Sequence, residues 1–141
     1  MEKSSLATAF DTLPDTPESD GEREYLLRHA GSFYAGRHLL VDLWDGENLS
    51  DANVIDAALR RGAEEAGATL LHIHLHEFTE NGGVSGVAVL AESHISIHTW
   101  PERGSAALDV FTCGDTNPEV AMMYMIEALQ AREYNLKCIK R

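Results

Sequence analysis

The chain has 141 residues, 44% of them hydrophobic, and a formal net charge of −12 at pH 7. This length corresponds to a single domain, and this apolar content is enough to build a hydrophobic core. The negative charge argues against nucleic acid or an anionic membrane as a partner, because both are bound by basic surfaces. No apolar run in the sequence approaches the ~20 residues of a membrane-spanning helix.

Residues 1–30 are predicted to be a flexible acidic tail, and residues 31–141 a single domain. Segment 11–24, DTLPDTPESDGERE, is rich in Pro, Asp, Glu, Ser and Thr. Such a segment buries too little apolar surface to offset the entropy lost on ordering. The N-terminus lacks the layout of a signal peptide, and the two cysteines do not form a CxxC motif. A cytoplasmic protein with reduced thiols is therefore expected.

The first predicted element of the domain is a strand at residues 37–45, where apolar and polar side chains alternate. A helix is predicted over residues 51–66, because its apolar residues recur at helical spacing. Ser50 is the expected N-cap residue of this helix, and Gly67 suits the position just after its end.

Further strands and a second helix are predicted downstream. The helix is expected to begin at Asn117 and Pro118, with the proline in its first turn, and to end near residue 133. The strands are expected at residues 69–78, 84–91, 92–100, 105–113 and 135–140. The order β-α-β-β-β-β-α-β predicts an α+β fold, a two-layer sandwich with an antiparallel β-sheet and helices on one face.

Residues 92–102, ESHISIHTWPE, bring serine hydroxyls, two imidazoles and two carboxylates into one short stretch. The period of two in a strand places His94 and His98 on one face and Ser93 on the other. Ser93 and His98 therefore cannot form a simple nucleophile–base pair on a regular strand. The pattern alone is equally compatible with a half-buried strand whose histidines are hydrogen-bonded.

The HIHLH stretch at residues 72–76 raises the question of a metal site. Its three histidines, His72, His74 and His76, share one face of the predicted strand, and alternating histidines can bind zinc. No HExxH or paired-cysteine pattern supplies further ligands. A solvated or sheet-packed row of histidines is favoured, and no metal site is predicted.

The two cysteines occupy different settings. Cys113 ends a predicted strand where Gly114 begins a loop, a position that suits a functional thiol, although free cysteines are often simply buried. Cys138 lies in the final predicted strand without chemically active neighbours. We interpret Cys138 as structural.

Residues 83–114, GVSGVAVLAESHISIHTWPERGSAALDVFTCG, resemble the short prokaryotic S-adenosylmethionine decarboxylase proenzymes, which depend on a pyruvoyl group. The upstream GRHLLVDLW and GATLLHIHLHEF segments are similar to the same family. The resemblance covers about residues 36–116, with a looser C-terminal helix and strand. The acidic tail has no counterpart in the resemblance.

The resemblance implies that the chain cuts its own backbone into a β chain ending at Glu92 and an α chain beginning at Ser93. In the family scheme the Ser93 hydroxyl attacks the Glu92 carbonyl and forms an ester. Elimination then leaves dehydroalanine, which loses ammonia and becomes the pyruvoyl group. By the same matching, His98 transfers the proton in the elimination, Ser85 supports processing, and a strained turn is expected just before Ser93.

The mature reaction implied by the resemblance is the decarboxylation of S-adenosylmethionine. The pyruvoyl group forms a Schiff base with the substrate amine and accepts the electrons released as CO2 leaves. Cys113 is expected to donate the proton to the former α-carbon. Glu102 is expected to bind the ribose hydroxyls, and Phe78 to stack on adenine, although the TENGG loop is one residue longer than the family pattern. His94 matches the family but receives no distinct role.

The resemblance also implies a homodimer whose product supplies aminopropyl groups for spermidine synthesis. Three alternatives stay open. The first is a pyruvoyl-dependent ornithine or arginine decarboxylase on the same fold, which a substrate panel would identify. The second is an unprocessed, non-enzymatic homologue, which uncleaved protein would indicate, and the third is a zinc-binding β protein that uses the HIHLH row. Putrescine dependence, the dimer surface and the role of the tail are not determined by the sequence.

Overall fold

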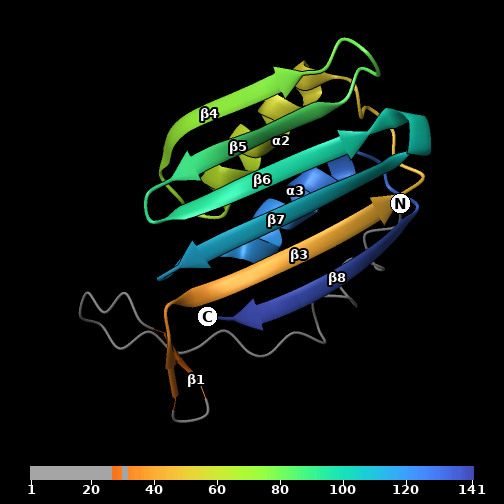
Figure 1. Ribbon diagram of the computed structural model, residues 1–141. Coiled ribbons are helices and arrows are strands. Elements are labelled where there is room, and N and C mark those ends of the chain that lie inside the picture. The colour runs from red at the N-terminus through yellow and green to blue at the C-terminus, as the bar shows by residue number, and fades with distance from the viewer. Residues whose placement is uncertain (1–26, 30–31) are drawn as a thin grey trace.

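The computed structural model describes residues 27–29 and 32–141. The predicted tail therefore lies outside the described residues, except for strand β1 (Leu27–His29). This strand pairs antiparallel with β2 (Ser32–Tyr34) as a separate two-stranded sheet, drawn beside the main body in Figure 1.

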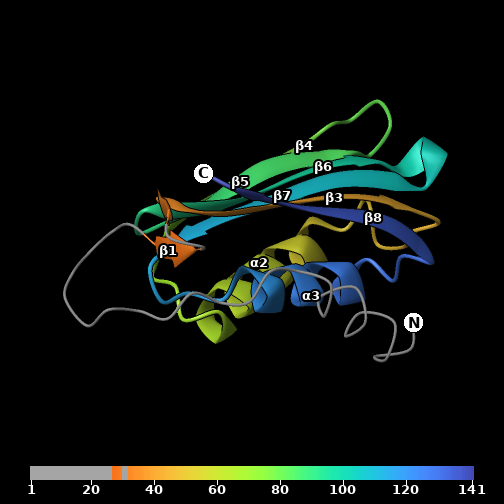
Figure 2. The same ribbon diagram turned by 90° about the horizontal axis from the view of Figure 1, so that it is seen from below.

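The main body is a six-stranded antiparallel sheet covered on one face by two helices (Figures 1 and 2). Its strands are β3 (Gly36–Trp44), β4 (Leu70–Glu77), β5 (Val84–Leu90), β6 (Ser93–Trp100), β7 (Ser105–Cys113) and β8 (Glu133–Lys140), and their order in space is β4-β5-β6-β7-β3-β8. The helices are α2 (Ala52–Glu65) and α3 (Pro118–Ala128), with a short 3₁₀ helix η1 (Pro101–Arg103) after β6. The predicted fold class and the predicted order of elements from β3 to β8 are confirmed, whereas strands β1 and β2 were not predicted. None of the helices among the described residues is long and apolar enough to cross a membrane.

Two predicted helix boundaries are wrong. The N-cap of α2 is Asp51 rather than Ser50, because the Asp51 carboxylate accepts hydrogen bonds from the backbone N–H groups of the first turn. Helix α3 ends at Ala128 rather than near residue 133, because Gln130 has a φ of 47°, a left-handed conformation that a helix cannot include.

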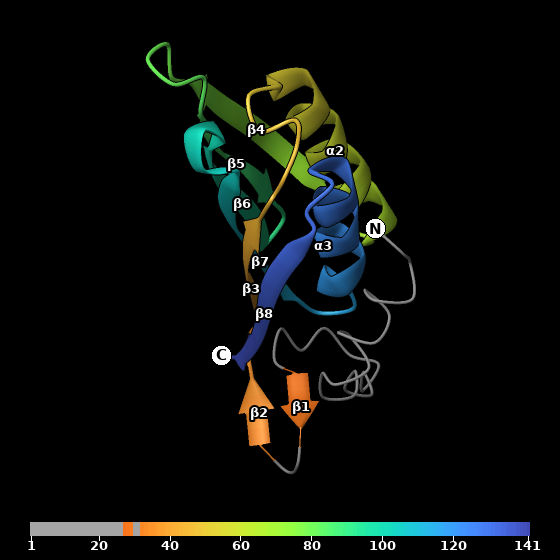
Figure 3. The ribbon, with the colours of Figure 1, turned by 90° about the vertical axis from the view of Figure 1, so that its right-hand side faces the viewer.

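The sheet and the helices form two layers in the edge-on view of Figure 3, and the hydrophobic core is made of the side chains that these layers bury between them. Alternate strand residues point toward α2 and α3 and are buried, among them Leu39, Leu43, Ile95, Ile97 and Val110. The helices contribute Ile55, Leu59, Met122, Met125 and Ile126. Each such side chain stabilises the fold by about 1.5–3 kcal/mol when it leaves water.

The other face of the sheet is not covered by a helix, and we call it the open face. It carries the remaining alternate residues, which include His38 on β3, Ser85 on β5, His94, Ser96, His98 and Trp100 on β6, and Asp109, Phe111 and Cys113 on β7. These open-face residues are half-buried or exposed. Almost all of the chemistry suggested by the sequence therefore lies on one surface.

Gly86 allows β4 to pair closely with β5 next to Ser85. A Cβ atom added at Gly86 would lie 2.3 Å from the backbone oxygen of His74, far closer than non-bonded atoms approach. Glycine is therefore required at this position of the GVSG segment for the β4–β5 pairing.

The hydroxyl of Thr99 connects β6 to two other parts of the fold. It accepts a hydrogen bond from the Val84 backbone N–H at 2.8 Å and donates one to the Leu49 carbonyl at 2.7 Å. Thr99 is buried, so these backbone groups have no ready access to water.

We expect Thr99→Val to lower the free energy of unfolding by about 1–3 kcal/mol, because it leaves buried backbone groups without a partner while keeping the side-chain shape. Urea unfolding followed by circular dichroism measures this change. The exposed Thr79 provides the control, and Thr79→Val should leave stability nearly unchanged. Equal stability of the two variants would contradict the bridging role of Thr99.

Candidate active site

The turn between β5 and β6 holds the predicted cleavage position. Leu90 and Ser93 are register partners, so the two strands are joined by Ala91 and Glu92 alone. Glu92 has a φ of 60°. A non-glycine residue in this left-handed region is strained by about 1–2 kcal/mol. The strained turn expected before Ser93 is therefore confirmed, and the strain adjoins the Glu92–Ser93 bond.

Cys113 approaches this turn from the neighbouring strand. Its thiol donates a hydrogen bond to the Glu92 backbone carbonyl oxygen at 3.1 Å. The Cys113 sulfur also lies 3.9 Å from the Ser93 hydroxyl oxygen, and Ser93 itself is only 8% exposed. We call Glu92, Ser93 and Cys113 the turn group. In this group the thiol contacts the same carbonyl that the Ser93 hydroxyl is expected to attack.

The surroundings of Cys113 keep its thiol protonated. Burial raises the pKa of the Cys113 thiol, and the negative charge of the nearby Glu92 carboxylate raises it further. The hydrogen bond with Ser93 acts in the opposite direction but does not cancel the increase in pKa. A thiol with a raised pKa is a proton donor at neutral pH rather than a thiolate nucleophile.

The remaining predicted residues gather at the opposite end of β5 and β6, and we call them the distal group: Phe78, Ser85, His98 and Glu102. Ser85 and His98 are register partners, and the Ser85 hydroxyl lies 3.0 Å from His98 Nδ1. Glu102, in η1, accepts a hydrogen bond from the Asn81 side chain at 3.2 Å. The contact with Asn81 was not anticipated from the sequence.

A cavity of about 340 Å³ adjoins the distal group. It is lined by Phe78, Glu80, Asn81, Ser85, Thr99 and Trp100. Two aromatic rings and several polar side chains therefore surround one hollow, and Glu102 is connected to it through Asn81. A larger hollow of about 550 Å³, formed mainly by residues 46–53, contains none of the predicted site residues.

The turn group and the distal group do not meet within one chain. Ser93 begins β6 on the helix side of the sheet, whereas His98 is exposed on the open face. Five residues of extended strand separate their Cα atoms by roughly 16 Å. The Ser85–His98 pair therefore lies too far from Ser93 to exchange a proton with it directly in the same protomer.

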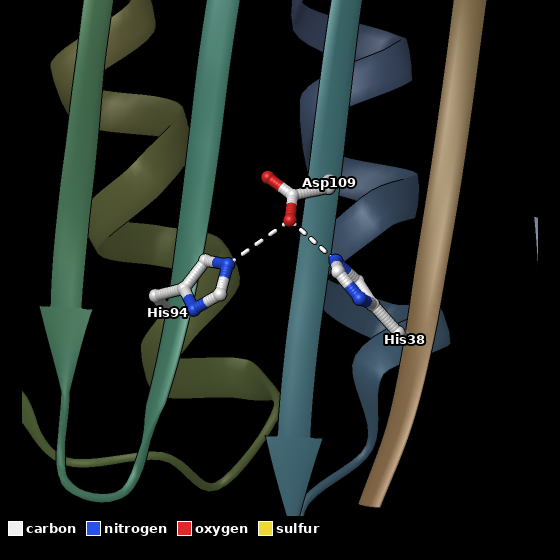
Figure 4. Close-up of side chains that lie close together, drawn as sticks. All are labelled: His38, His94 and Asp109. Carbon is white, nitrogen blue, oxygen red and sulfur yellow. Dashed lines mark hydrogen bonds and ion pairs between the residues drawn. The ribbon is translucent and has the colours of Figure 1, made fainter. Parts of the chain in front are cut away.

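A further cluster on the open face was not predicted. His38, His94 and Asp109 converge from β3, β6 and β7 (Figure 4). Burial would raise the pKa of Asp109, but hydrogen bonds from Ser96, His38 and His94 outweigh it and lower this pKa, so the carboxylate stays ionised. The sequence contains one signal for this cluster. His94 and Asp109 are polar residues on the alternating pattern of two consecutive predicted strands, 92–100 and 105–113.

Comparison with known proteins gives consistent matches. A family model described as S-adenosylmethionine decarboxylase matches residues 37–141. An S-adenosylmethionine decarboxylase proenzyme of Thermomicrobium roseum is 41% identical over 107 residues, which cover 75% of this chain and 92% of the relative. A proenzyme with the same name from Methanococcus aeolicus is 45% identical over 111 residues, which cover 77% of this chain and 94% of the relative. The crystal structure of the adenosylmethionine decarboxylase from Aquifex aeolicus superposes with a TM-score of 0.67 and 35% identity, covering 75% of this chain and 89% of that one.

The raised thiol pKa predicts how Cys113 reacts with iodoacetamide. In a Ser93→Ala chain, which keeps the backbone intact, alkylation of Cys113 should increase only at a pH above the ordinary thiol range. Adding Glu92→Gln removes a negative charge next to the thiol, so the midpoint of the pH–rate profile should move to lower pH. Peptide mass spectrometry separates Cys113 from Cys138. Glu64→Gln on the exposed side of α2 should leave the midpoint unchanged, and no shift with Glu92→Gln would refute the electrostatic effect.

Proposed function

The chain belongs to the S-adenosylmethionine decarboxylase family, and we propose that it cleaves itself between Glu92 and Ser93 and then decarboxylates S-adenosylmethionine with the resulting pyruvoyl group. The observation that carries this proposal is the hydrogen bond from the Cys113 thiol to the Glu92 carbonyl, beside Ser93 in a strained turn. The family match and the relatives named as proenzymes support it.

The contacts of the turn group support self-cleavage, because the Cys113 thiol lies on the Glu92 carbonyl beside Ser93. The Ser93 oxygen attacks the Glu92 carbonyl carbon, the C–N bond of the peptide breaks as the hydroxyl proton passes to the released nitrogen, and an ester links the two residues. The Cys113 S–H group stabilises the negative charge that develops on the carbonyl oxygen during this attack. Removal of the Ser93 α-proton then expels the Glu92 carboxylate, and water releases ammonia to leave the pyruvoyl group. Strain at Glu92 favours the first step because it is released when the peptide bond opens.

In the mature enzyme, residue 93 would be a pyruvoyl group, whose carbonyl supplies an electron sink for the decarboxylation. The position of Ser93 fits this group, because the residue is nearly buried at the start of β6 and lies beside Cys113. The protonated thiol of Cys113 is placed to return a proton to the substrate carbon after CO2 leaves.

The distal group fits a nucleoside substrate. The cavity between Phe78 and Trp100 presents aromatic rings on which an adenine base can stack. Glu102 provides a carboxylate that can accept hydrogen bonds from ribose hydroxyls, and Asn81 holds this carboxylate in place. The net negative charge of the chain is compatible with the positive sulfonium of S-adenosylmethionine. Ornithine and arginine have neither a nucleobase to stack on these rings nor a ribose to hydrogen-bond with Glu102.

We further propose that a second copy of the chain completes each site. The turn group and the distal group lie at opposite ends of the same strands, so a two-fold axis perpendicular to β6 would place the turn group of one copy near the distal group of the other. The open face also exposes large apolar side chains: Trp44, Val89, Trp100 and Ile139 are each at least 40% exposed. Such a surface favours burial against another protein surface.

The first test of the function is self-cleavage. We expect the purified wild-type chain to resolve into fragments of 92 and 49 residues (1–92 and 93–141), the second without a free amino terminus. The Ser93→Ala chain should remain whole and inactive, because the attacking hydroxyl is missing. Intact-mass spectrometry followed by a CO2-release assay measures both properties. A wild-type chain that stays whole would contradict the proposal, and a free amino terminus at Ser93 would indicate simple hydrolysis.

The completion of the site by a second copy can be tested by mixing two inactive variants. In a mixed dimer of Ser93→Ala and His98→Ala chains, the intact Ser93 of one chain meets the intact His98 of the other. The His98→Ala chain should then be cleaved, and decarboxylation should recover to roughly a quarter of the wild-type rate if the chains pair at random. Co-expression with two affinity tags and mass spectrometry measures the cleavage of each chain.

The matched control combines Ser93→Ala with Cys113→Ala. These two residues belong to the turn group of the same chain, so no mixed dimer of these variants contains a complete site. Decarboxylation should stay absent in this mixture. If the His98→Ala chain stays uncleaved beside Ser93→Ala chains in confirmed mixed dimers, then His98 does not act on the other copy.

The substrate assignment is tested at Glu102. Glu102→Gln can still accept the hydrogen bond from Asn81 but loses its charge, and a hydrogen bond to a charged group contributes about 1.5–3 kcal/mol. We expect kcat/KM for S-adenosylmethionine to fall roughly ten- to a hundredfold while self-cleavage continues. Glu80→Gln, at the edge of the same cavity, should have little effect. CO2 release from ornithine or arginine, with none from S-adenosylmethionine, would overturn the substrate and leave the pyruvoyl chemistry standing.

A further inference from the structure

The cluster of His38, His94 and Asp109 is not used by the proposed reaction, although it lies on the same open face. His38 and His94 are both register partners of Phe111, one on each side of β7, and Asp109 lies two residues away on β7. The Asp109 Oδ2 atom lies 2.5 Å from His38 Nε2 and 3.0 Å from His94 Nε2. Dashed lines mark both contacts in Figure 4. Three neighbouring strands thus direct three potential ligand atoms to one point.

These atoms form a ligand set that transition metals use. Two imidazole nitrogens and one carboxylate oxygen all lie within 4.8 Å of one another. Among the described residues, this is the one group of three or more His, Cys, Asp or Glu side chains whose ligand atoms lie that close together. Two histidines and one carboxylate bind zinc and non-haem iron in proteins, with further positions left for water. The row His72, His74 and His76 differs, because alternate residues along a strand are roughly 6.6 Å apart.

Neighbouring side chains hold this ligand set in place. Ser96 donates a hydrogen bond to the second carboxylate oxygen of Asp109 and so fixes the orientation of the carboxylate. The Phe111 ring contacts both imidazoles, with centroid distances of 5.6 Å to His38 and 6.0 Å to His94. Outer-shell contacts of this kind orient ligands in metal sites.

The accessibility and charge of the cluster also suit a cation. The His38 and Asp109 side chains are 15% and 17% exposed, whereas the His94 side chain is 37% exposed, so the cluster is enclosed on the β3 side and open toward β6. An ionised carboxylate in a half-buried setting is stabilised by a compensating positive charge. A metal ion bound between the two imidazoles and the carboxylate would supply that charge.

We infer that His38, His94 and Asp109 form a binding site for a divalent transition-metal ion of the zinc class, with water completing the coordination. The ion would link β3, β6 and β7 beside the start of β6. This inference concerns metal binding alone and does not rest on the proposed decarboxylation.

Titration of the full-length Ser93→Ala chain with Co²⁺ tests the site, because Co²⁺ takes zinc positions and its visible absorption reports its ligands. We expect one equivalent to bind with a d–d spectrum typical of nitrogen and oxygen ligands, and Zn²⁺ to displace it. His38→Ala and Asp109→Asn should abolish this signal. Ser96→Ala should weaken the affinity about ten- to a hundredfold. Circular dichroism establishes that each variant is folded.

His74→Ala, in the row of alternating histidines, is the matched control and should leave the Co²⁺ signal unchanged. The proposal is overturned if the folded chain binds no Co²⁺, because the cluster is then a hydrogen-bonded network only. It is also overturned if the signal survives in Asp109→Asn but is lost in His74→Ala. Charge-transfer bands that disappear in Cys113→Ser would assign the ion to the thiol instead and would equally refute the site.

Discussion

Helices α2 and α3 cover only one face of the six-stranded sheet, and this one-sided covering determines where apolar and polar side chains can lie. Each strand must then place apolar side chains toward the helices at every second position, and the positions between them are free to carry polar groups. This division explains why buried Ile95 and Ile97 alternate with His94, Ser96 and His98 in β6. Most side chains of the candidate site therefore lie on the face opposite the core, whereas Ser93 begins β6 on the core side.

The register between β6 and β7 determines which side chains of these two strands meet in the candidate site. His94 pairs with Phe111, so Cys113 comes level with the turn that holds Glu92, and its thiol reaches the Glu92 carbonyl. The same register places Asp109 opposite Ser96. A slip of one residue would move these side chains to the helix side and expose the core. The burial of the core therefore fixes the geometry of the turn group.

Sequence reasoning predicted what depends on local pattern. Alternation and helical spacing gave the order of elements in the domain, and the period of two correctly separated Ser93 from His98. Helix ends were less well predicted, because Ser50 and Asp51 are both good caps and only their contacts distinguish them. The contacts of Cys113 with Glu92 and of His38 with Asp109 could not be predicted from pattern, since they depend on which strands are neighbours. Strand β3 pairs with β7 and β8, which lie far from it in sequence.

The strand order would also let the fold tolerate the proposed cleavage at Glu92–Ser93. The segment before the bond contains β3, β4 and β5, and the segment after it contains β6, β7 and β8. In the sheet these strands interleave, because β6 pairs with β5, and β3 lies between β7 and β8. Separating the two cleaved chains would require breaking three strand pairings and opening the core between α2 and α3. Only the turn itself, with its left-handed Glu92, gains freedom when the bond is cut. The peptide bond expected to be cut is thus one whose loss removes strain and breaks no strand pairing.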